Sequence, residues 1–283
     1  MTDTAALIGV GAMGKALLSR LQIAKKRVRA YDVSDAGREA ARMGGAEVVG
    51  SAAEAVRGAA YIHLFVRTDD QEIEATLGPD GVLAGASPGA LLILHPTVLP
   101  STTLRVGQAA KAKQLRVLDV PITSVPARVQ AGQATFLVGG DKEVAEAARP
   151  YLLELGGSFY YFGPLGSGNV AKLAKNYANA AVRIAIDESI RVAETGGLDP
   201  KQFLDMMRDL DTGSLVAEWE KTWTVKDGHA IHRPATNLFN KDLGLTADYV
   251  AAMGVDLPVA KAAADIGRKW SAMWARQKAA QTG

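Results

Sequence analysis

The chain has 283 residues, which is enough for one large domain or for two of ordinary size. Hydrophobic residues make up 48% and charged residues 22%, the balance of a globular protein, and the formal net charge of +2 gives no reason to expect nucleic acid or an anionic membrane as a partner. The absence of cysteine excludes disulfides and thiolate metal sites, and with only 4 histidines we expect no metal site.

The N-terminal residues MTDTAALIGVG contain no basic leader, and Gly9 interrupts their apolar run. No uninterrupted apolar stretch reaches the roughly 18 residues that a membrane span requires. We therefore expect a soluble protein of the cytoplasm that acts on a small molecule and has no membrane partner.

Short apolar runs alternate with alanine-rich, helix-like segments over the first 160 residues or so. Such alternation is typical of a parallel sheet covered by helices on both faces. Several runs are continuously apolar, as strands buried on both faces are. The runs are residues 5–10, 27–32, 60–66, 91–95, 116–122 and 135–140.

The pattern changes after residues 158–166, where strand-like runs end. A long helix is predicted from Ser167 to about Thr195, because its residues are good helix formers and Gly196, Gly197 and Pro200 follow it. Further helical segments fill the rest of the chain. We expect an α/β Rossmann-type doubly wound sheet over residues 1–163, then an all-helical domain over 164–283 built on a long spine helix.

Three glycines at the spacing G-x-G-x-x-G lie in the stretch IGVGAMG, residues 8–14. In a chain with 29 glycines the motif alone is weak, and a plain loop is the alternative. Here the motif follows an apolar strand and opens an amphipathic helix. Gly9 permits a tight turn, Gly11 lets a pyrophosphate approach the backbone, and Gly14 lets the helix pack on the strand. The context favours a dinucleotide-binding turn.

Asp32 ends the second predicted strand, eighteen residues beyond Gly14. This is close to the roughly 20 residues expected for an acid that binds the ribose 2′-hydroxyl of NAD. A carboxylate there repels the 2′-phosphate of NADP, and the nearest following arginine, Arg38, is six residues away. The sequence favours NAD over NADP; a solvated turn is the alternative for Asp32.

A second group of polar residues opens the long helix. Lys172 and Asn176 are four residues apart and share one helical face, and Asn179 falls on the same side. A solvated helix face is the ordinary interpretation of this pattern. The helix follows the nucleotide domain directly, however, so we expect its first turns at a cleft between domains, where ligands bind.

Four motifs in order resemble those of the β-hydroxyacid dehydrogenases, which include 3-hydroxyisobutyrate dehydrogenase and tartronate semialdehyde reductase. They are IGVGAMGKAL (8–17), DVPITSVPARVQAGQATFLVGG (119–140), GSGNVAKLAKN (166–176) and NKDLGL (240–245). The resemblance covers nearly the whole chain. It implies a Rossmann domain followed by a helical domain, and an enzyme that oxidises a hydroxyl β to a carboxylate or reduces the matching aldehyde or ketone.

The resemblance also implies site residues. Lys172 would be the catalytic lysine, Asn176 would position the substrate, and Lys241, supported by Asp242, would lie near the nicotinamide. Burial against cofactor and apolar walls would lower the pKa of a lysine toward the range useful for proton transfer. Cofactor contacts would come from Gly9, Gly11, Ala12, Met13, Gly14, Asp32, Val66, Thr97 and Lys241.

The chain departs from the family at its substrate loop. Relatives read Ser-Gly-Gly and hold the substrate carboxylate there, whereas this chain reads Thr123-Ser124-Val125. Valine does not take the positive φ that glycine accepts, so we expect either a changed loop or a changed substrate. An atypical or bulkier substrate is the favoured prediction.

A second departure lies in ILHPTVLP, residues 93–100, where relatives read D-x-S-T-x-x-P. Thr97 and Pro100 remain, whereas Pro96 removes a backbone N–H. His95 is either a polar group of the cleft or, as the sequence favours, a histidine bonded to a backbone carbonyl. For Trp219 and Trp223 the alternatives are packing between helices and a wall of the substrate pocket.

Two other functions remain open. An imine reductase or reductive aminase shares the two-domain build, but usually has another residue at the lysine position. A non-enzymatic NAD-binding module would not need Lys172. The second domain also predicts a symmetric oligomer, because a long helix exposes apolar surface unless it is paired, and the resemblance implies a homodimer or homotetramer.

Overall fold

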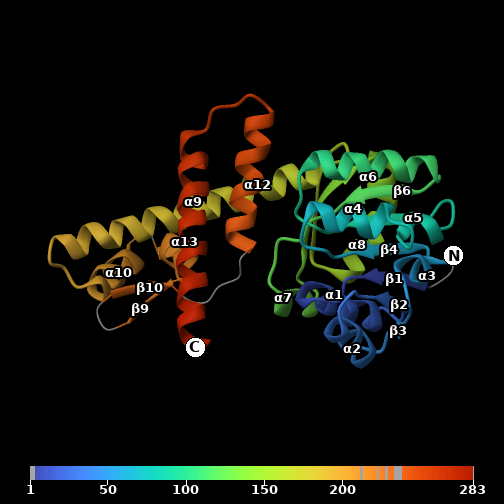
Figure 1. Ribbon diagram of the computed structural model, residues 1–283, viewed down its shortest axis with the longest axis horizontal. Helices are drawn as coiled ribbons and strands as arrows, with labels where there is room; N and C mark the ends of the chain where they lie inside the picture. The colour runs from blue at the N-terminus through green and yellow to red at the C-terminus, as the bar shows by residue number, and fades with distance from the viewer. Residues whose placement is uncertain (1–3, 211–212, 222, 227–228, 233–237, 283) are drawn as a thin grey trace. The chain divides into compact units, whose positions relative to one another are not determined.

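The computed structural model describes residues 4–210, 213–221, 223–226, 229–232 and 238–282. The chain divides into two compact units, residues 1–172 and 173–283. The division falls inside the long helix α9 (Ser167–Thr195), so α9 begins in the first unit and continues into the second (Figure 1).

An eight-stranded sheet forms the centre of the first unit, in the order β3-β2-β1-β4-β5-β6-β7-β8. Its first six strands have the order of a doubly wound dinucleotide-binding fold and are all parallel; β7 runs antiparallel to β6 and parallel to β8. The strands are β1 (Thr4–Ile8), β2 (Arg27–Tyr31), β3 (Glu47–Val48), β4 (Tyr61–Leu64), β5 (Leu91–Leu94), β6 (Arg116–Asp119), β7 (Thr135–Gly140) and β8 (Ser158–Gly163).

Both faces of the sheet are covered, which explains the continuously apolar strands. Successive residues of β1 enter different cores: Ala5 and Leu7 join one cluster, Ala6 and Ile8 the other. The first cluster packs on α1 (Ala12–Ile23), α2 (Asp35–Met43), α7 (Pro126–Gln130) and α8 (Lys142–Leu155). The second packs on α3 (Ala52–Val56), α5 (Val82–Gly85) and α6 (Pro100–Ala112), with α4 (Asp69–Leu77) beside it (Figure 1).

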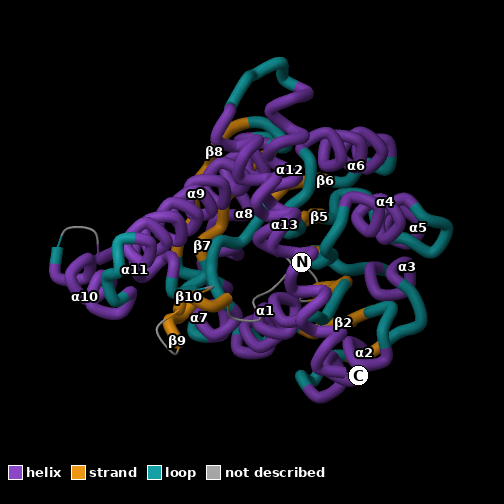
Figure 2. Tube along the Cα trace, turned by 60° about the vertical axis from the view of Figure 1, so that its left-hand side comes forward, coloured by secondary structure: helices purple, strands orange, loops and turns teal. Residues whose placement is uncertain are grey.

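The second unit consists of the rest of α9 with α10 (Pro200–Asp209), α11 (Gly213–Trp219), α12 (Leu238–Ala252) and α13 (Pro258–Thr282). The predicted fold class is confirmed, with one correction to the all-helical second domain. An antiparallel hairpin of β9 (Trp223–Lys226) and β10 (His229–His232) stands among these elements, and Figure 2 draws it in orange. The sequence analysis missed it because neither strand, WTVK or HAIH, contains more than two consecutive apolar residues.

Aromatic packing fills the core of the second unit. Trp219 stacks on Trp223 with ring centroids 6.2 Å apart, and Trp223 meets Trp270 edge-on at 5.1 Å. All three rings are buried, together with apolar residues of α9, α10 and α12. The structure therefore supports the packing interpretation of Trp219 and Trp223.

None of the described helices combines the length and the hydropathy that a membrane-spanning segment requires.

Candidate active site

Two of the three glycines of the motif, Gly9 and Gly14, are required by close backbone packing, and Gly11 is not. Gly9 has φ +88°, and a Cβ there would overlap the carbonyl oxygen of Phe65. A Cβ on Gly14 would overlap the carbonyl oxygen of Gly9, so helix α1 lies directly against the turn. Around Gly11, by contrast, a Cβ would find nothing within 4 Å.

Gly11 is therefore not required by the protein's own packing. It is the N-cap residue of α1, where no side chain caps the helix and no acidic residue occupies the first turn. The open space beside Gly11 and the N–H groups at the start of α1, with Ala12 and Met13 in its first turn, form a cradle that fits a pyrophosphate group.

Asp32 lies at the end of β2, beside this turn. One carboxylate oxygen accepts a hydrogen bond from Val10 N at 2.7 Å, and the other accepts from Ser34 N at 2.8 Å and Ser34 Oγ at 2.7 Å. Burial works to raise the pKa of Asp32, but the hydrogen bonds from Val10 and Ser34 outweigh it and hold the pKa below its usual value. Asp32 is therefore a carboxylate at neutral pH.

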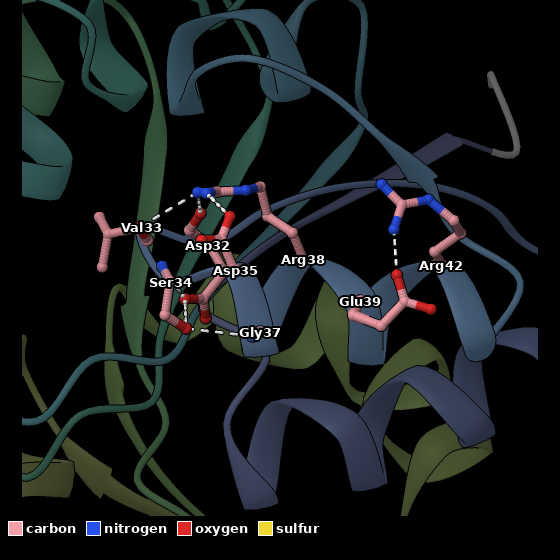
Figure 3. A network of polar contacts seen from close by, with 8 residues as sticks. All are labelled: Asp32, Val33, Ser34, Asp35, Gly37, Arg38, Glu39 and Arg42. Atoms are coloured by element: carbon pink, nitrogen blue, oxygen red, sulfur yellow. Dashed lines mark hydrogen bonds and ion pairs between the residues drawn. The ribbon is translucent and has the colours of Figure 1, made fainter.

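Arg38 is held by its own turn (Figure 3). Its guanidinium donates to the carbonyl oxygens of Asp32 at 2.8 Å and Val33 at 3.0 Å, and it pairs with the Asp35 carboxylate. One turn further along α2, Arg42 pairs with Glu39. The basic groups that follow Asp32 are thus engaged within the protein.

The strand ends next to β1 carry the other predicted cofactor contacts. Val66 follows β4 and is half-buried, and Thr97 follows β5 and is also half-buried. The backbone beyond Thr97 is fixed: Val98 N donates to Asn169 Oδ1 at 3.2 Å, and Leu99 N donates to Asp69 Oδ1 at 2.9 Å. These strand ends lie at the carboxyl edge of the parallel sheet, where open α/β folds bind ligands.

His95 is 5% exposed and does not extend into open space. Its Nδ1 lies 2.7 Å from the carbonyl oxygen of Val120, and its Nε2 lies 2.9 Å from Nδ1 of His63. Burial lowers the pKa of His95 to about 4 and that of His63 well below its usual value. The structure supports the interpretation of His95 as a buried, carbonyl-bonded histidine.

Asp119 and Asn169 attach the start of α9 to the sheet. The Asp119 carboxylate, at the end of β6, accepts from Gly166 N at 2.8 Å and Asn169 N at 2.7 Å. The Asn169 side chain reaches Val98 N and Thr103 Oγ1. Burial raises the pKa of Asp119 to about 6 in spite of these backbone hydrogen bonds.

The sequence analysis did not select Asp119, Asn169 or His63 as site residues. Asp119 and Asn169 each lie inside a family motif, and an acid at the end of an apolar strand was a usable signal for Asp119. His63 gave none, because a single histidine in an apolar strand has no recognisable spacing.

Lys172 is positioned by the loop that carries the sequence departures. Its Nζ donates to the carbonyl oxygen of Ile122 at 2.6 Å, one residue before Thr123. Thr123 and Ser124 are half-buried, and Thr123 N bonds the carbonyl oxygen of Thr135. Val125 has φ −103° and ψ 155°, is 57% exposed, and precedes α7. Valine is accommodated in extended backbone, without a positive φ.

In the second unit, Asp242 joins two predicted site residues. Its carboxylate accepts from Asn176 Nδ2 at 2.6 Å, and its other oxygen lies 3.5 Å from Lys241 Nζ. Asn176 is four residues beyond Lys172 on α9. Lys175, the other lysine of this stretch, has its pKa lowered by burial.

Comparisons with known proteins cover almost the whole chain. Residues 4–163 match the NAD binding domain of 6-phosphogluconate dehydrogenase, and residues 166–281 match the NAD-binding of NADP-dependent 3-hydroxyisobutyrate dehydrogenase. The chain is 30% identical to the NAD-dependent L-serine dehydrogenase of Pseudomonas aeruginosa, over 93% of this chain and 90% of that one. It is 32% identical to a probable 3-hydroxyisobutyrate dehydrogenase of Mycobacterium tuberculosis, over 95% and 92%.

Solved structures also match nearly the whole chain. The Mycobacterium tuberculosis 3-hydroxyisobutyrate dehydrogenase with L-serine matches with a TM-score of 0.83 and 29% identity, over 96% of this chain and 94% of that one. An imine reductase from Myxococcus stipitatus, in complex with NAD+, matches with a TM-score of 0.67 at 18% identity, over 96% and 95%. At that identity the second match shows a shared fold only.

Proposed function

Because the chain belongs to the β-hydroxyacid dehydrogenase family and is an NAD(P)-dependent dehydrogenase of the kind that acts on CH–OH groups, we propose that it transfers a hydride between NAD and a β-hydroxyacid or the matching aldehyde or ketone. The observation that carries the proposal is the position of Lys172, whose ammonium lies 2.6 Å from the Ile122 carbonyl at the entrance to the Thr123–Val125 loop.

The cofactor site fits a dinucleotide. The cradle beside Gly11, the uncapped start of α1 and the Asp32 carboxylate supply the groups that a pyrophosphate and an adenosine ribose require. When bound, the nicotinamide supplies the hydride acceptor or donor. The proposed contacts are Gly9, Gly11, Ala12, Met13, Gly14, Asp32, Val66 and Thr97, with Lys241 from the second unit.

NAD rather than NADP is the proposed cofactor. The Asp32 carboxylate repels a 2′-phosphate, and Arg38, the nearest candidate to neutralise one, is occupied by two carbonyls and Asp35. The relative from Pseudomonas aeruginosa is described as NAD-dependent, which supports this choice.

Lys172 is the proposed acid–base residue. In the oxidation it takes the proton of the substrate hydroxyl, and in the reduction it returns that proton and stabilises the developing alkoxide. Asn176 is proposed to position the substrate, and the hydrogen bond to Asp242 fixes the orientation of its amide. In this proposal Asp242 also orients Lys241.

The proposed substrate is larger or more apolar than a plain three-carbon hydroxyacid. Its carboxylate would meet Thr123 and Ser124, whereas Val125 presents an exposed isopropyl group where the family has a bare glycine. An exposed apolar side chain beside a carboxylate site favours a substrate with an apolar substituent.

Replacing Lys172 by methionine tests the catalytic assignment. We expect turnover to fall by about two to four orders of magnitude, because general acid–base catalysis is lost, while the Kd for NAD measured by calorimetry stays within a few-fold. Lys175→Met is the matched control on the same helix, and it should keep turnover. Near-normal turnover in Lys172→Met would contradict the assignment.

A panel of β-hydroxyacids and aldehydes, read by NADH and NADPH absorbance, tests substrate and cofactor together. The same panel with ketone plus amine tests the imine reductase alternative, which Lys172 argues against. Tight NADH binding without turnover on any hydroxyacid would favour a non-enzymatic NAD-binding module.

We further propose that residues 1–163 form the cofactor-binding domain, and that residues 164–283 form the substrate and dimerisation domain of a homodimer or homotetramer. Large apolar side chains exposed on the second unit, such as Val192, Leu198 and Leu210, support the assembly. Light scattering of the purified protein tests it. Residence in the cytoplasm stays a prediction, which cell fractionation would test.

A further inference from the structure

A chain of hydrogen-bonded rings runs through the core of the first unit, outside the proposed catalytic set. Tyr151 of α8 lies with its hydroxyl 2.7 Å from Nε2 of His63 on β4. Nδ1 of His63 lies 2.9 Å from Nε2 of His95, just beyond β5. Tyr151 is 7% exposed and the two histidines less. Side chains of α8, of β4 and of the residue after β5 therefore form one buried row of hydrogen bonds.

The direction of donation along these hydrogen bonds follows from the last acceptor, the Val120 carbonyl. Nδ1 of His95 faces the carbonyl oxygen of Val120 at 2.7 Å, so this nitrogen must carry the proton and donate. Nε2 of the neutral His95 ring is then an acceptor, which requires Nδ1–H on His63. Nε2 of His63 is an acceptor in turn, so Tyr151 donates its hydroxyl proton. Both rings are neutral Nδ1–H tautomers.

Val120 belongs to the segment that holds the catalytic lysine. Two residues later, the Ile122 carbonyl accepts from Lys172 Nζ at 2.6 Å. One residue earlier, Asp119 binds the backbone at the start of α9, the helix that carries Lys172. The His95 hydrogen bond is thus the side-chain contact to Val120 in the middle of this segment, where Val120 N also donates to the Leu94 carbonyl at 2.7 Å and the Pro121 carbonyl accepts from Leu137 N at 3.1 Å.

The flat face of the His95 ring packs on Phe65, which in turn contacts the glycine turn. His95 stacks on Phe65 with ring centroids 4.3 Å apart. Phe65 N donates to the carbonyl oxygen of Ile8 at 2.7 Å, and the Phe65 carbonyl is the group against which Gly9 packs. One buried imidazole therefore contacts both the strand end that supports the glycine turn and the segment that holds Lys172.

We propose that His95 is a positioning residue for hydride transfer, oriented by His63 and Tyr151, and that it fixes the Ile122 carbonyl and so the ammonium of Lys172 relative to the glycine turn. The inference rests on the proposed function for its catalytic consequence. The tautomers and the geometry of the ring chain do not depend on that function.

Three variants test the inference. His95→Leu removes both hydrogen bonds and keeps an apolar side chain in the core. His95→Asn places an amide donor near the position of Nδ1 and restores the bond to Val120. Leu152→Ala, next to Tyr151 on α8 and fully buried in the same core, destabilises the unit without touching the ring chain.

We expect kcat of His95→Leu to fall by about tenfold to a hundredfold, because small displacements of a reacting group have effects of this size. The pH at which kcat is half-maximal should shift, since the surroundings of Lys172 change. His95→Asn should regain much of kcat and the original pH profile. Leu152→Ala should lower the melting temperature yet keep that profile.

Nuclear magnetic resonance of histidine-labelled protein supplies a readout that needs no turnover. Two rings should show the neutral Nδ1–H tautomer, with one of these signals lost in His95→Leu. The backbone amide of Thr123 should shift in His95→Leu and stay in place in Leu152→Ala. An Nε2–H tautomer for His95, or an unmoved Thr123 amide, would overturn the inference.

The two failures are distinguishable. If the unaltered protein oxidises no β-hydroxyacid while the tautomers and the Thr123 shift are as expected, the proposed function is wrong and the positioning chain stands. If the unaltered protein is active and His95→Leu keeps its kcat and pH profile, the inference alone is wrong.

Discussion

The glycine turn and the Thr123–Val125 loop are two proposed ligand-binding loops of the first unit, and they respond to sequence change in opposite ways. In the turn, Gly9 and Gly14 are required because a Cβ on either would overlap backbone oxygen. In the loop, glycine has been replaced by Val125, whose extended φ of −103° puts no strain on the backbone. The turn tolerates no side chain at Gly9 or Gly14, whereas the loop accepts a bulky one at Val125.

This difference indicates where the enzyme can vary. The backbone of the glycine turn is fixed by close packing at Gly9 and Gly14, and a change at either position disturbs the fold as well as the proposed cofactor site. The named substrates differ between relatives, serine in one and 3-hydroxyisobutyrate in others, and in the loop proposed to meet the substrate carboxylate the Val125 side chain is exposed. Specificity can therefore change there at little cost in stability.

The largest expected effect comes from Gly9→Ala. The added methyl group overlaps the Phe65 carbonyl at a positive φ, which costs about 1–3 kcal/mol for the strained backbone alone and more for the overlap. We expect loss of NAD binding together with a marked drop in melting temperature, measured by calorimetry.

Gly11→Ala is the matched control, because its methyl group meets nothing within 4 Å. The melting temperature should stay close to that of the unaltered protein, while the Kd for NAD rises at least about tenfold, or roughly 1.4 kcal/mol. Unchanged NAD affinity in Gly11→Ala would contradict the proposal that the pyrophosphate binds beside Gly11.

Asp119→Asn has the second-largest expected effect, a loss in the free energy of unfolding. An amide offers one oxygen to the two N–H groups of Gly166 and Asn169, so a buried donor is left unsatisfied at a cost of about 1–3 kcal/mol. Chemical denaturation at pH 7 measures the free energy of unfolding. An unchanged value would mean that this carboxylate does not hold the start of α9.

The same residue predicts a pH dependence. The folded-state pKa of Asp119, about 6, lies above the ordinary value of 3.8, so the folded protein binds this proton more tightly. The contribution of Asp119 to stability therefore falls as pH rises from about 4 to about 6, by an amount on the order of 2–3 kcal/mol. In Asp119→Asn this part of the pH dependence should disappear.

Asp32→Asn should act on cofactor choice more than on folding. The amide oxygen can still accept from Val10 N, but the charge that repels a 2′-phosphate is gone. We expect the ratio of kcat/KM for NAD to that for NADP to fall at least about tenfold, which corresponds to roughly 1.4 kcal/mol. Gly37→Ala, whose methyl group would overlap the Asp32 carboxylate, should shift the ratio in the same direction.

Val125→Gly has the smallest expected effect and tests the variable loop itself. Val125 is exposed, so the loss of stability should stay below about 1 kcal/mol. Relative kcat/KM should move a few-fold toward three-carbon hydroxyacids, as measured on the substrate panel. If the relative kcat/KM values of the substrates do not change, the proposal that Val125 contacts the substrate is wrong.

Local signals in the sequence account for the elements that were predicted correctly. The apolar runs of the six predicted strands, the helix from Ser167 to Thr195 and the glycine turn all depend on residues close together in the chain. The two-residue β3 and the β9–β10 hairpin were missed, because none of these strands contains more than two consecutive apolar residues. The roles of Lys172, Asn176 and Lys241 stay predictions.

The amino-acid sequence by itself determined the succession of strands and helices along the chain, the glycine turn with Asp32, and the family. Each of these rests on the spacing of residues along the chain. Only the tertiary structure decided that His63, His95 and Tyr151 form one line, that Asp119 holds the start of α9, and that Lys172 reaches the Ile122 carbonyl. These contacts join residues 32 to 88 positions apart. Pairing over such separations is set by how the sheet and helices pack, which no local pattern encodes.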